Sequence, residues 1–214
     1  MPSVGCRLPK THEAIRDLGA RQDAAALEIL AGVAGVEDQY LRRTALEVIG
    51  RHPQGRELRA VILTALGDPS EYVVRTACKV VEEWELFEAR DLLVPLLANV
   101  RGATRRGAVR ALGTVWIGAD FSLVFSMYGK DTDADVRREA AWVLRRRVTA
   151  ADWRPLFDAF SADALARHRQ WACELAEGFS DQEILPLLSR LSSDPDGHVR
   201  KAATRATEAI SSRP

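Results

Sequence analysis

The 214-residue sequence has few of the residues that build disulfide frameworks and metal sites. Its three cysteines, Cys6, Cys78 and Cys173, lie far apart rather than in CxxC pairs. An odd number of scattered cysteines favours neither a disulfide scaffold nor a zinc site and is typical of a reducing compartment. We therefore expect no metal, no cofactor and a cytoplasmic location.

Long hydrophobic runs are also missing. No segment approaches the roughly 20 apolar residues that a helix needs to span a bilayer. The opening residues, MPSVGCRLPK, lack the apolar core of a secretory signal. We expect a protein with no membrane partner.

Net charge is absent too, because 30 Lys and Arg balance 30 Asp and Glu. A neutral total gives no whole-chain attraction to nucleic acid or anionic lipid. The distribution is uneven, however. Residues 101–147, called the basic segment below, hold ten basic and five acidic side chains, a net charge of +5.

One short pattern is present six times: an apolar residue, an arginine, two variable residues and a small residue. Apolar residues follow each copy three or four positions later, which is helical periodicity. The spacings between successive arginines are 33, 30, 32, 32 and 31 residues. These arginines are Arg42, Arg75, Arg105, Arg137, Arg169 and Arg200.

Turn and capping residues precede several copies of the pattern. Aspartate accepts hydrogen bonds from the free N–H groups of a first helical turn, so these residues predict the start of a second helix in each hairpin. They are Asp38, Asp68 to Ser70, Asp131 to Asp135 and Asp194 to Gly197. The first helices are predicted at residues 22–32, 55–66, 88–98, 120–128, 152–160 and 181–192. Residues 10–19 resemble the tail of an earlier second helix and predict an N-terminal cap.

The pattern resembles the HEAT repeat family, particularly its short phycobilisome lyase-type repeats, over about residues 10–210. The resemblance implies an all-α fold: a right-handed α-solenoid (superhelix) of about six antiparallel helical hairpins. Because one hairpin cannot bury its apolar face alone, the repeats should stack as a single domain over residues 1–214, with repeats at about 21–210. The third and fifth copies depart from the pattern, since Thr104 and His168 replace valine.

The resemblance also implies two roles for the side chains of the second helices. The six pattern arginines are expected to be structural, each paired with an aspartate of a neighbouring repeat. Other positions are expected to line a concave binding face: Arg43, Glu47, Thr76, Val80, Arg106, Arg110, Arg138, Trp142, Gln170, Glu174, Lys201 and Arg205.

Arginines lie beside tryptophans on this predicted face, as a stacking or cation–π surface requires. Packing between repeats is an equally good interpretation of Trp142 and Trp171, and it is the expected role of Trp84, Trp116 and Trp153. The candidate binding residues are Arg106, Arg110, Arg138, Trp142, Arg145, Arg146 and Trp171.

A converging set of catalytic or metal-binding side chains is missing. The histidines His12, His52, His168 and His198 lie in different repeats, and His12-Glu13 is a single His-Glu pair. HEAT-like iron hydroxylases use several such pairs, and neither GxSxG nor a P-loop motif occurs. We expect no catalytic residue. The repeat type shared with phycobilin lyases does not by itself imply bilin chemistry.

The leading hypothesis is a non-enzymatic scaffold that binds a protein partner on its concave face. The alternative is nucleic-acid binding through the basic segment, because one family of alkylpurine DNA glycosylases is built from HEAT-like repeats and binds DNA in a basic groove. That resemblance is one of architecture and carries over no catalytic residue. Asp133, Asp135 and Glu139 are expected to start helices or lie on the surface. A regulator or immunity factor is a third interpretation.

Overall fold

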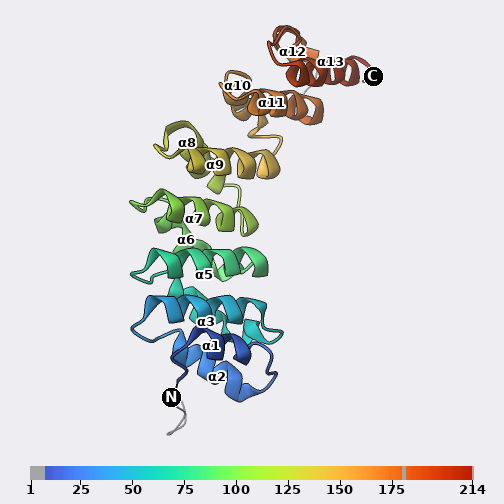
Figure 1. Cartoon of the computed structure of the whole chain (residues 1–214). Helices are drawn as coiled ribbons and strands as arrows, with labels where there is room; N and C mark the ends of the chain where they lie inside the picture. The colour runs from blue at the N-terminus through green and yellow to red at the C-terminus, as the bar shows by residue number, and fades with distance from the viewer. Residues whose placement is uncertain (1–7, 180–181, 214) are drawn as a thin grey trace. The chain divides into compact units, whose positions relative to one another are not determined.

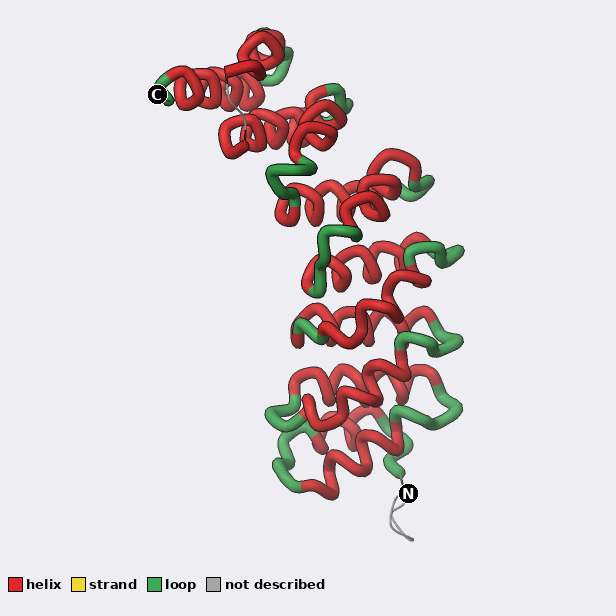
Figure 2. The backbone as a smooth tube through the Cα atoms, turned by 180° about the vertical axis from the view of Figure 1, so that it is seen from behind, coloured by secondary structure: helices red, strands yellow, loops and turns green. Residues whose placement is uncertain are grey.

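The computed structural model describes residues 8–179 and 182–213, which are helices joined by short loops without a strand (Figures 1 and 2). The described chain divides into two compact units. The first contains residues 8–117 and 132–139, and the second contains residues 118–131 and 140–213, with its described gap at 180–181. The fold class is the predicted one, an all-α solenoid of helical hairpins. The expectation that residues 1–214 form a single domain stays a prediction.

In the first unit, helical hairpins stack in chain order (Figure 1). Helix α3 packs against α1, α2 and α5, while α5 packs against α4 and α7, and α7 packs against α6. The first helices begin with a short 3-10 turn in two of the hairpins. The elements are α1 (His12–Leu18), α2 (Ala24–Val33), α3 (Gln39–Arg51), η1 (Gly55–Leu58), α4 (Arg59–Ala65), α5 (Glu71–Trp84), η2 (Phe87–Ala89), α6 (Arg90–Leu96) and α7 (Gly102–Thr114).

In the second unit, α11 packs against α10, α12 and α13, and α12 packs against α13. The elements are α8 (Asp120–Lys130), α10 (Trp153–Ser161), α11 (Ala166–Phe179), η3 (Gln182–Ile184), α12 (Leu185–Leu191) and α13 (Gly197–Ser211). Helix α9 (Ala134–Arg147) is shared, because its first residues belong to the first unit and the rest to the second.

The predicted helical periodicity places one face of each second helix in the core. Ile49, Val81, Leu112, Leu144 and Ala206 are all buried. Burial of such side chains contributes roughly 1.5–3 kcal/mol each, which supplies the stabilisation that a lone hairpin lacks. The expectation that Val80 lies on the binding face is wrong. Val80 is buried, and its Cγ2 lies so close to Gly50 that a Cβ there would be 2.8 Å away.

The capping aspartates divide into two groups. Asp38 and Asp196 cap α3 and α13 as predicted, each accepting hydrogen bonds from two backbone N–H groups of the first turn. Asp68 and Asp194 do not cap the following helix, contrary to the prediction. Each accepts from the backbone N–H two residues on, Ser70 at 2.8 Å and Asp196 at 2.8 Å, and holds the loop in a tight turn.

Two sequence expectations concern residues outside the described part of the chain. Cys6 and residue 181, the predicted start of a first helix, lie outside the described residues. Among the residues that the structure does describe, no helix has the length and apolar character needed to cross a membrane.

Candidate binding groove

The pattern arginines join consecutive repeats where an aspartate lies in the next loop. Arg42 donates Nε to Asp68 Oδ2 at 2.8 Å and Nη2 to Asp68 Oδ1 at 2.8 Å. Its Nη1 donates to two carbonyls of its own loop, Val36 at 2.9 Å and Glu37 at 2.6 Å. One guanidinium thus ties its own loop to the next. We call this arrangement the arginine ladder.

The second unit repeats the same geometry. Arg169 donates Nε to Asp194 Oδ2 at 2.7 Å and Nη2 to Oδ1 at 2.9 Å, while its Nη1 donates to the carbonyls of Asp163 and Ala164, both at 2.9 Å. The hydrogen bonds from Arg169 lower the pKa of Asp194, because they favour the charged carboxylate more than burial opposes it. The pair is therefore ionised and fixed.

Other pattern arginines make the loop contacts as well. Arg105 donates Nη1 to the carbonyl of Asn99 at 2.8 Å, and Arg200 donates Nη1 to the carbonyls of Asp194 at 2.7 Å and Pro195 at 2.9 Å. Arg137 also has an interaction partner. These contacts explain why the arginine recurs at a nearly constant spacing.

Arg75 is the exception among the six. Arg42 and Arg169 each pair with an aspartate in the loop of the following repeat. In the loop of the repeat that follows Arg75, the corresponding residue is Asn99. The expected pairing of Arg75 with an aspartate is not made, and within the described chain Arg75 has neither a hydrogen bond nor an ion pair. Its side chain is exposed and lies in a groove.

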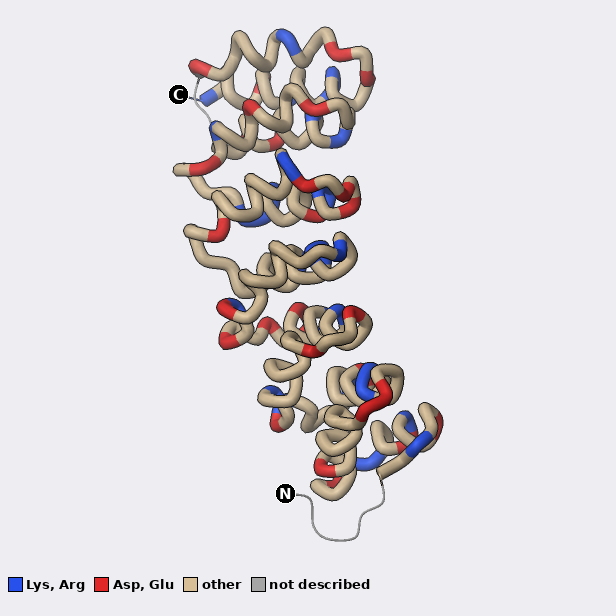
Figure 3. Tube along the Cα trace, turned by 90° about the vertical axis from the view of Figure 1, so that its left-hand side faces the viewer, with Lys and Arg blue, Asp and Glu red and all other residues tan. Residues whose placement is uncertain are grey.

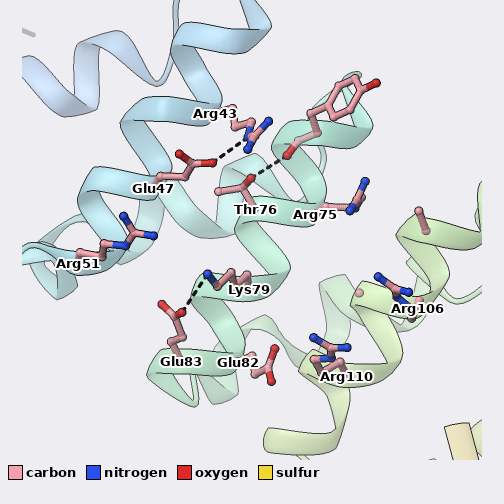
Figure 4. A pocket seen from close by; sticks show the side chains of 13 residues that line it. Arg43, Glu47, Arg51, Arg75, Thr76, Lys79, Glu82, Glu83, Arg106 and Arg110 are labelled. Atoms are coloured by element: carbon pink, nitrogen blue, oxygen red, sulfur yellow. Dashed lines mark hydrogen bonds and ion pairs between the residues drawn. The ribbon is translucent and has the colours of Figure 1, made fainter. Parts of the chain in front are cut away.

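This groove runs across α3, α5 and α7 in the first unit and has a volume of about 760 Å³ (Figure 4). It is lined by second-helix side chains, six of which are basic and three acidic, a net charge of +3. The lining residues are Arg43, Glu47, Arg51, Tyr72, Arg75, Thr76, Lys79, Glu82, Glu83, Ala103, Arg106, Gly107 and Arg110.

Some of the basic side chains in the groove form ion pairs with acidic side chains. Arg43 pairs with Glu47 at 2.8 Å within α3, and Lys79 is 3.6 Å from Glu83 within α5. These pairs are substantially exposed, so each contributes little to stability and can open for a ligand at small cost. Arg51, like Arg75, has no partner within the described chain.

Glu82 and Arg110 lie toward the α7 side of the groove. Burial raises the pKa of Glu82, and the positive charge of Arg110 opposes that rise. Arg110 also donates to both carboxylate oxygens of Glu139, at 3.1 and 2.6 Å. This end of the groove is therefore close to neutral, and the unpaired positive charge is on α3 and α5.

The arginines predicted to form a basic surface are mostly paired with carboxylates. Arg106 is 3.5 Å from Asp135, which also pairs with Arg138, and Arg145 Nη2 lies 2.6 Å from Glu174 Oε2. Figure 3 marks both basic and acidic positions along the chain. The net charge of the basic segment thus gives no surface of unopposed arginines.

Trp142 and Trp171, for which the sequence allowed either packing or binding, have different surroundings. Trp142 is 41% exposed, with the Arg146 guanidinium 4.7 Å from its ring centre. Trp171 lies against the rings of His168 and Phe160, at centroid distances of 5.1 and 5.9 Å, and the Arg145 guanidinium is 5.2 Å from its ring centre. Trp171 therefore combines packing with a cation–π contact, and Trp142 is the more exposed of the two. Trp84 is buried, as expected, and donates Nε1 to the Gly50 carbonyl at 3.2 Å.

His168 belongs to a buried polar cluster in the second unit. Its Nδ1 lies 2.9 Å from Asp163 Oδ2, the same oxygen that accepts a hydrogen bond from the Tyr128 hydroxyl. Burial and the neighbouring Asp163 raise the pKa of Tyr128. Because His168 and Tyr128 are both buried, the cluster holds α8 and α11 together and offers no open catalytic centre.

The described part of the chain contains neither an exposed cysteine nor a cluster of metal ligands. Cys78 and Cys173 are free and buried, and burial raises the pKa of each thiol to about 12. No group of three or more His, Cys, Asp or Glu side chains converges there as metal ligands would.

Of the predicted binding residues, Arg106 and Arg110 line the groove, whereas Arg138, Trp142, Arg145, Arg146 and Trp171 do not. The sequence interpretation missed eight lining residues, because it followed net charge rather than partners. The sequence does contain one signal for the groove: Asn99 stands where the loops of other repeats have aspartate. The missed residues are Arg51, Tyr72, Arg75, Lys79, Glu82, Glu83, Ala103 and Gly107.

Comparison with solved structures places the fold among helical repeat stacks. A designed armadillo repeat protein superposes with a TM-score of 0.62 at 19% identity, over 85% of this chain and 98% of that one. An archaeal HEAT-like repeats protein from Thermococcus onnurineus gives 0.56 at 14% identity, over 96% and 99%. The complex of CpcE and CpcF of phycocyanin lyase from a Nostoc species gives 0.55 at 17% identity, over 98% and 97%.

The chain is thus an α-helical repeat protein. The sequence profile of HEAT repeats matches residues 58–145, which cover α4 to most of α9. Residues 58–145 therefore match HEAT repeats, the family that the arginine pattern resembles. No curated protein matches it in sequence.

Proposed function

We propose that this chain is a protein-binding module that holds an extended segment of a partner protein in the groove across α3, α5 and α7. The observation that carries the proposal is the groove itself, in which unpaired guanidinium groups, exposed ion pairs and the Tyr72 ring face solvent together. Such a mixture suits the varied side chains of a peptide better than it suits one small substrate.

The groove's length also fits a peptide. Packed helices lie 8–10 Å apart, so three successive second helices span roughly 20 Å. An extended chain rises about 3.3 Å per residue, so about six residues would cross the groove. Side chains that alternate along the peptide would then meet successive helices.

Nucleic acid binding is the competing proposal and is less well supported. Binding a phosphate backbone requires several cationic side chains, each of which displaces a counterion from the phosphates. Arg110, Arg138 and Arg145 are already paired with carboxylates, and an incoming phosphate would approach those carboxylates as well. A glycosylase activity has no further support, since no catalytic set is identified. Cytoplasmic location stays a prediction.

The test begins with random peptides displayed on phage and selected against the whole chain. Enriched peptides are synthesised with a fluorescein label and titrated by fluorescence anisotropy. Thr76→Trp places a large ring in the groove and should weaken binding by at least about tenfold. Thr204→Trp is the matched control, because Thr204, like Thr76, is a second-helix threonine whose hydroxyl donates to the carbonyl four residues earlier.

Equal loss with both tryptophan variants, or no loss with Thr76→Trp, would contradict the proposed function. Labelled single-stranded and duplex oligonucleotides are titrated in parallel at low and physiological salt. Tight binding that falls steeply with salt and is lost in the Arg106→Ala, Arg138→Ala double variant would replace the protein-binding proposal with the nucleic-acid one.

A further inference from the structure

Asn99 occupies the position in its loop that an aspartate holds elsewhere in the arginine ladder. Its Oδ1 accepts a hydrogen bond from the backbone N–H of Arg101, two residues on, at 3.0 Å. Asp68 and Asp194 accept from the N–H two residues on in the same way. The loop geometry is therefore retained, and what changes is the chemistry of the side chain.

That change removes the negative charge and one of the two acceptor oxygens that the preceding arginine would meet. A carboxylate accepts two hydrogen bonds from Nε and Nη2 of one guanidinium and neutralises its charge. An asparagine has no charge, and its amide nitrogen is a donor that cannot replace the Oδ2 that accepts from Nε in the two ladder pairs. Arg75 therefore has no ion-pair partner, whereas Arg42 and Arg169 each have one.

The released side chain lies in the groove. Arg75 extends from α5 toward the side on which Arg106 of α7 lies (Figure 4). Tyr72, one turn earlier on α5, is 41% exposed beside it and adds an apolar ring face. A guanidinium held on a rigid helix, with five N–H donors and no acceptor, is a ready site for a planar anion.

We propose that Asn99 frees Arg75 to bind a carboxylate, so that the groove recognises a partner segment rich in Asp or Glu. This inference rests on the proposed function and names the chemistry of the partner. A peptide carboxylate suits the site because its two oxygens match the guanidinium fork. Its single charges can also be spaced to avoid Glu47, Glu82 and Glu83, which a continuous phosphate backbone would meet.

The probe is a short fluorescein-labelled peptide of alternating Glu and Gly, titrated by anisotropy against the whole chain. A peptide with Gln in place of Glu is its neutral control. The Glu peptide should bind and the Gln peptide should not. Arg75→Ala should weaken binding roughly tenfold, the effect of losing one hydrogen-bonded charge pair. Arg75→Lys, which keeps the charge but not the fork, should recover part of the loss.

Asn99→Asp is the sharpest variant. It returns the missing carboxylate, so Arg75 should be drawn back into the ladder, with weaker peptide binding and a higher urea midpoint in the same protein. A merely structural role for Asn99 would change stability without changing affinity. Arg205→Ala, an exposed arginine of α13 outside the groove, should leave binding unchanged and serves as the charge-matched control.

The outcomes separate the two proposals. Unchanged Glu-peptide affinity in both Arg75→Ala and Asn99→Asp would overturn the role of Arg75, even if Thr76→Trp still blocked selected peptides and the groove remained the binding site. No loss with Thr76→Trp would overturn the groove as well. Equal binding of the Glu and Gln peptides would contradict recognition of acidic segments.

Discussion

Arg42 and Asp68 connect two consecutive repeats through parallel hydrogen bonds of 2.8 Å each, from Nε to Oδ2 and from Nη2 to Oδ1. The same two atoms of Arg169 contact Asp194 in the second unit. The carboxylates come 26 and 25 residues after their arginines, so each pair fixes the position of the next hairpin. Within the described chain, Arg75 and Arg200 have no such carboxylate partner, and Arg75 also lacks the loop contacts that Arg200 makes.

Removing a paired ladder arginine should destabilise the protein far more than removing Arg75. The Arg169 and Asp194 side chains are 15% and 6% exposed, so Arg169→Ala leaves a largely buried carboxylate without its cation and should cost about 3 kcal/mol. Arg75→Ala removes an exposed side chain without partners and should change stability by less than about 0.5 kcal/mol. Urea unfolding of both variants measures the difference. Similar losses would mean that Arg75 is structural after all.

Acid should weaken the ladder. Hydrogen bonds from Arg169 lower the pKa of Asp194 in the folded chain below its ordinary value. A depressed folded pKa contributes stability that is present above the unfolded pKa and is lost as pH falls through the folded one. Asp194→Asn should be less stable near neutral pH and should lose less stability on acidification. Urea midpoints from neutral pH into the acid range test this, and parallel curves for the two proteins would contradict it.

Thr104 offers a stabilising substitution. It stands where most other repeats have valine, it is buried, and its Oγ1 has no hydrogen-bond partner. A buried hydroxyl without a partner costs about 1–3 kcal/mol. Thr104→Val keeps the shape and should raise the free energy of unfolding by about 1 kcal/mol. Thr44→Val is the contrasting change, because the Thr44 hydroxyl is bonded to the Tyr40 carbonyl at 2.9 Å, and it should not stabilise the protein.

Tyr128→Phe should destabilise the second unit. The Tyr128 hydroxyl donates a hydrogen bond to the Asp163 carboxylate. Burial disfavours the charged form of Asp163, and hydrogen bonds with His168 and Tyr128 stabilise it. Losing one of these donors should cost about 1–2 kcal/mol in thermal or urea unfolding. Tyr72→Phe, at an exposed position, is the control and should have little effect. An unchanged midpoint for Tyr128→Phe would show that the cluster contributes no stability.

The repeats were predictable because their cause is local. Helical periodicity, the regular arginine spacing and the caps at Asp38 and Asp196 are all properties of neighbouring residues. The groove was not predictable in the same way. Which arginines are free depends on partners such as Glu139 and Glu174, 29 residues from Arg110 and Arg145 and placed by the stacking of hairpins. Net charge along the chain therefore indicated the basic segment, while the unpaired cations lie on α3 and α5.

The position of the binding site can be measured directly by NMR. Amide and arginine side-chain signals of the isotope-labelled chain are recorded while the alternating Glu and Gly peptide is added. The account predicts shifts of Arg75, Tyr72 and neighbouring groove residues on α3, α5 and α7, with little change at Trp142 or Arg146. Shifts centred on α9 instead, with Arg75 unchanged, would contradict the groove and support the basic segment as the binding site.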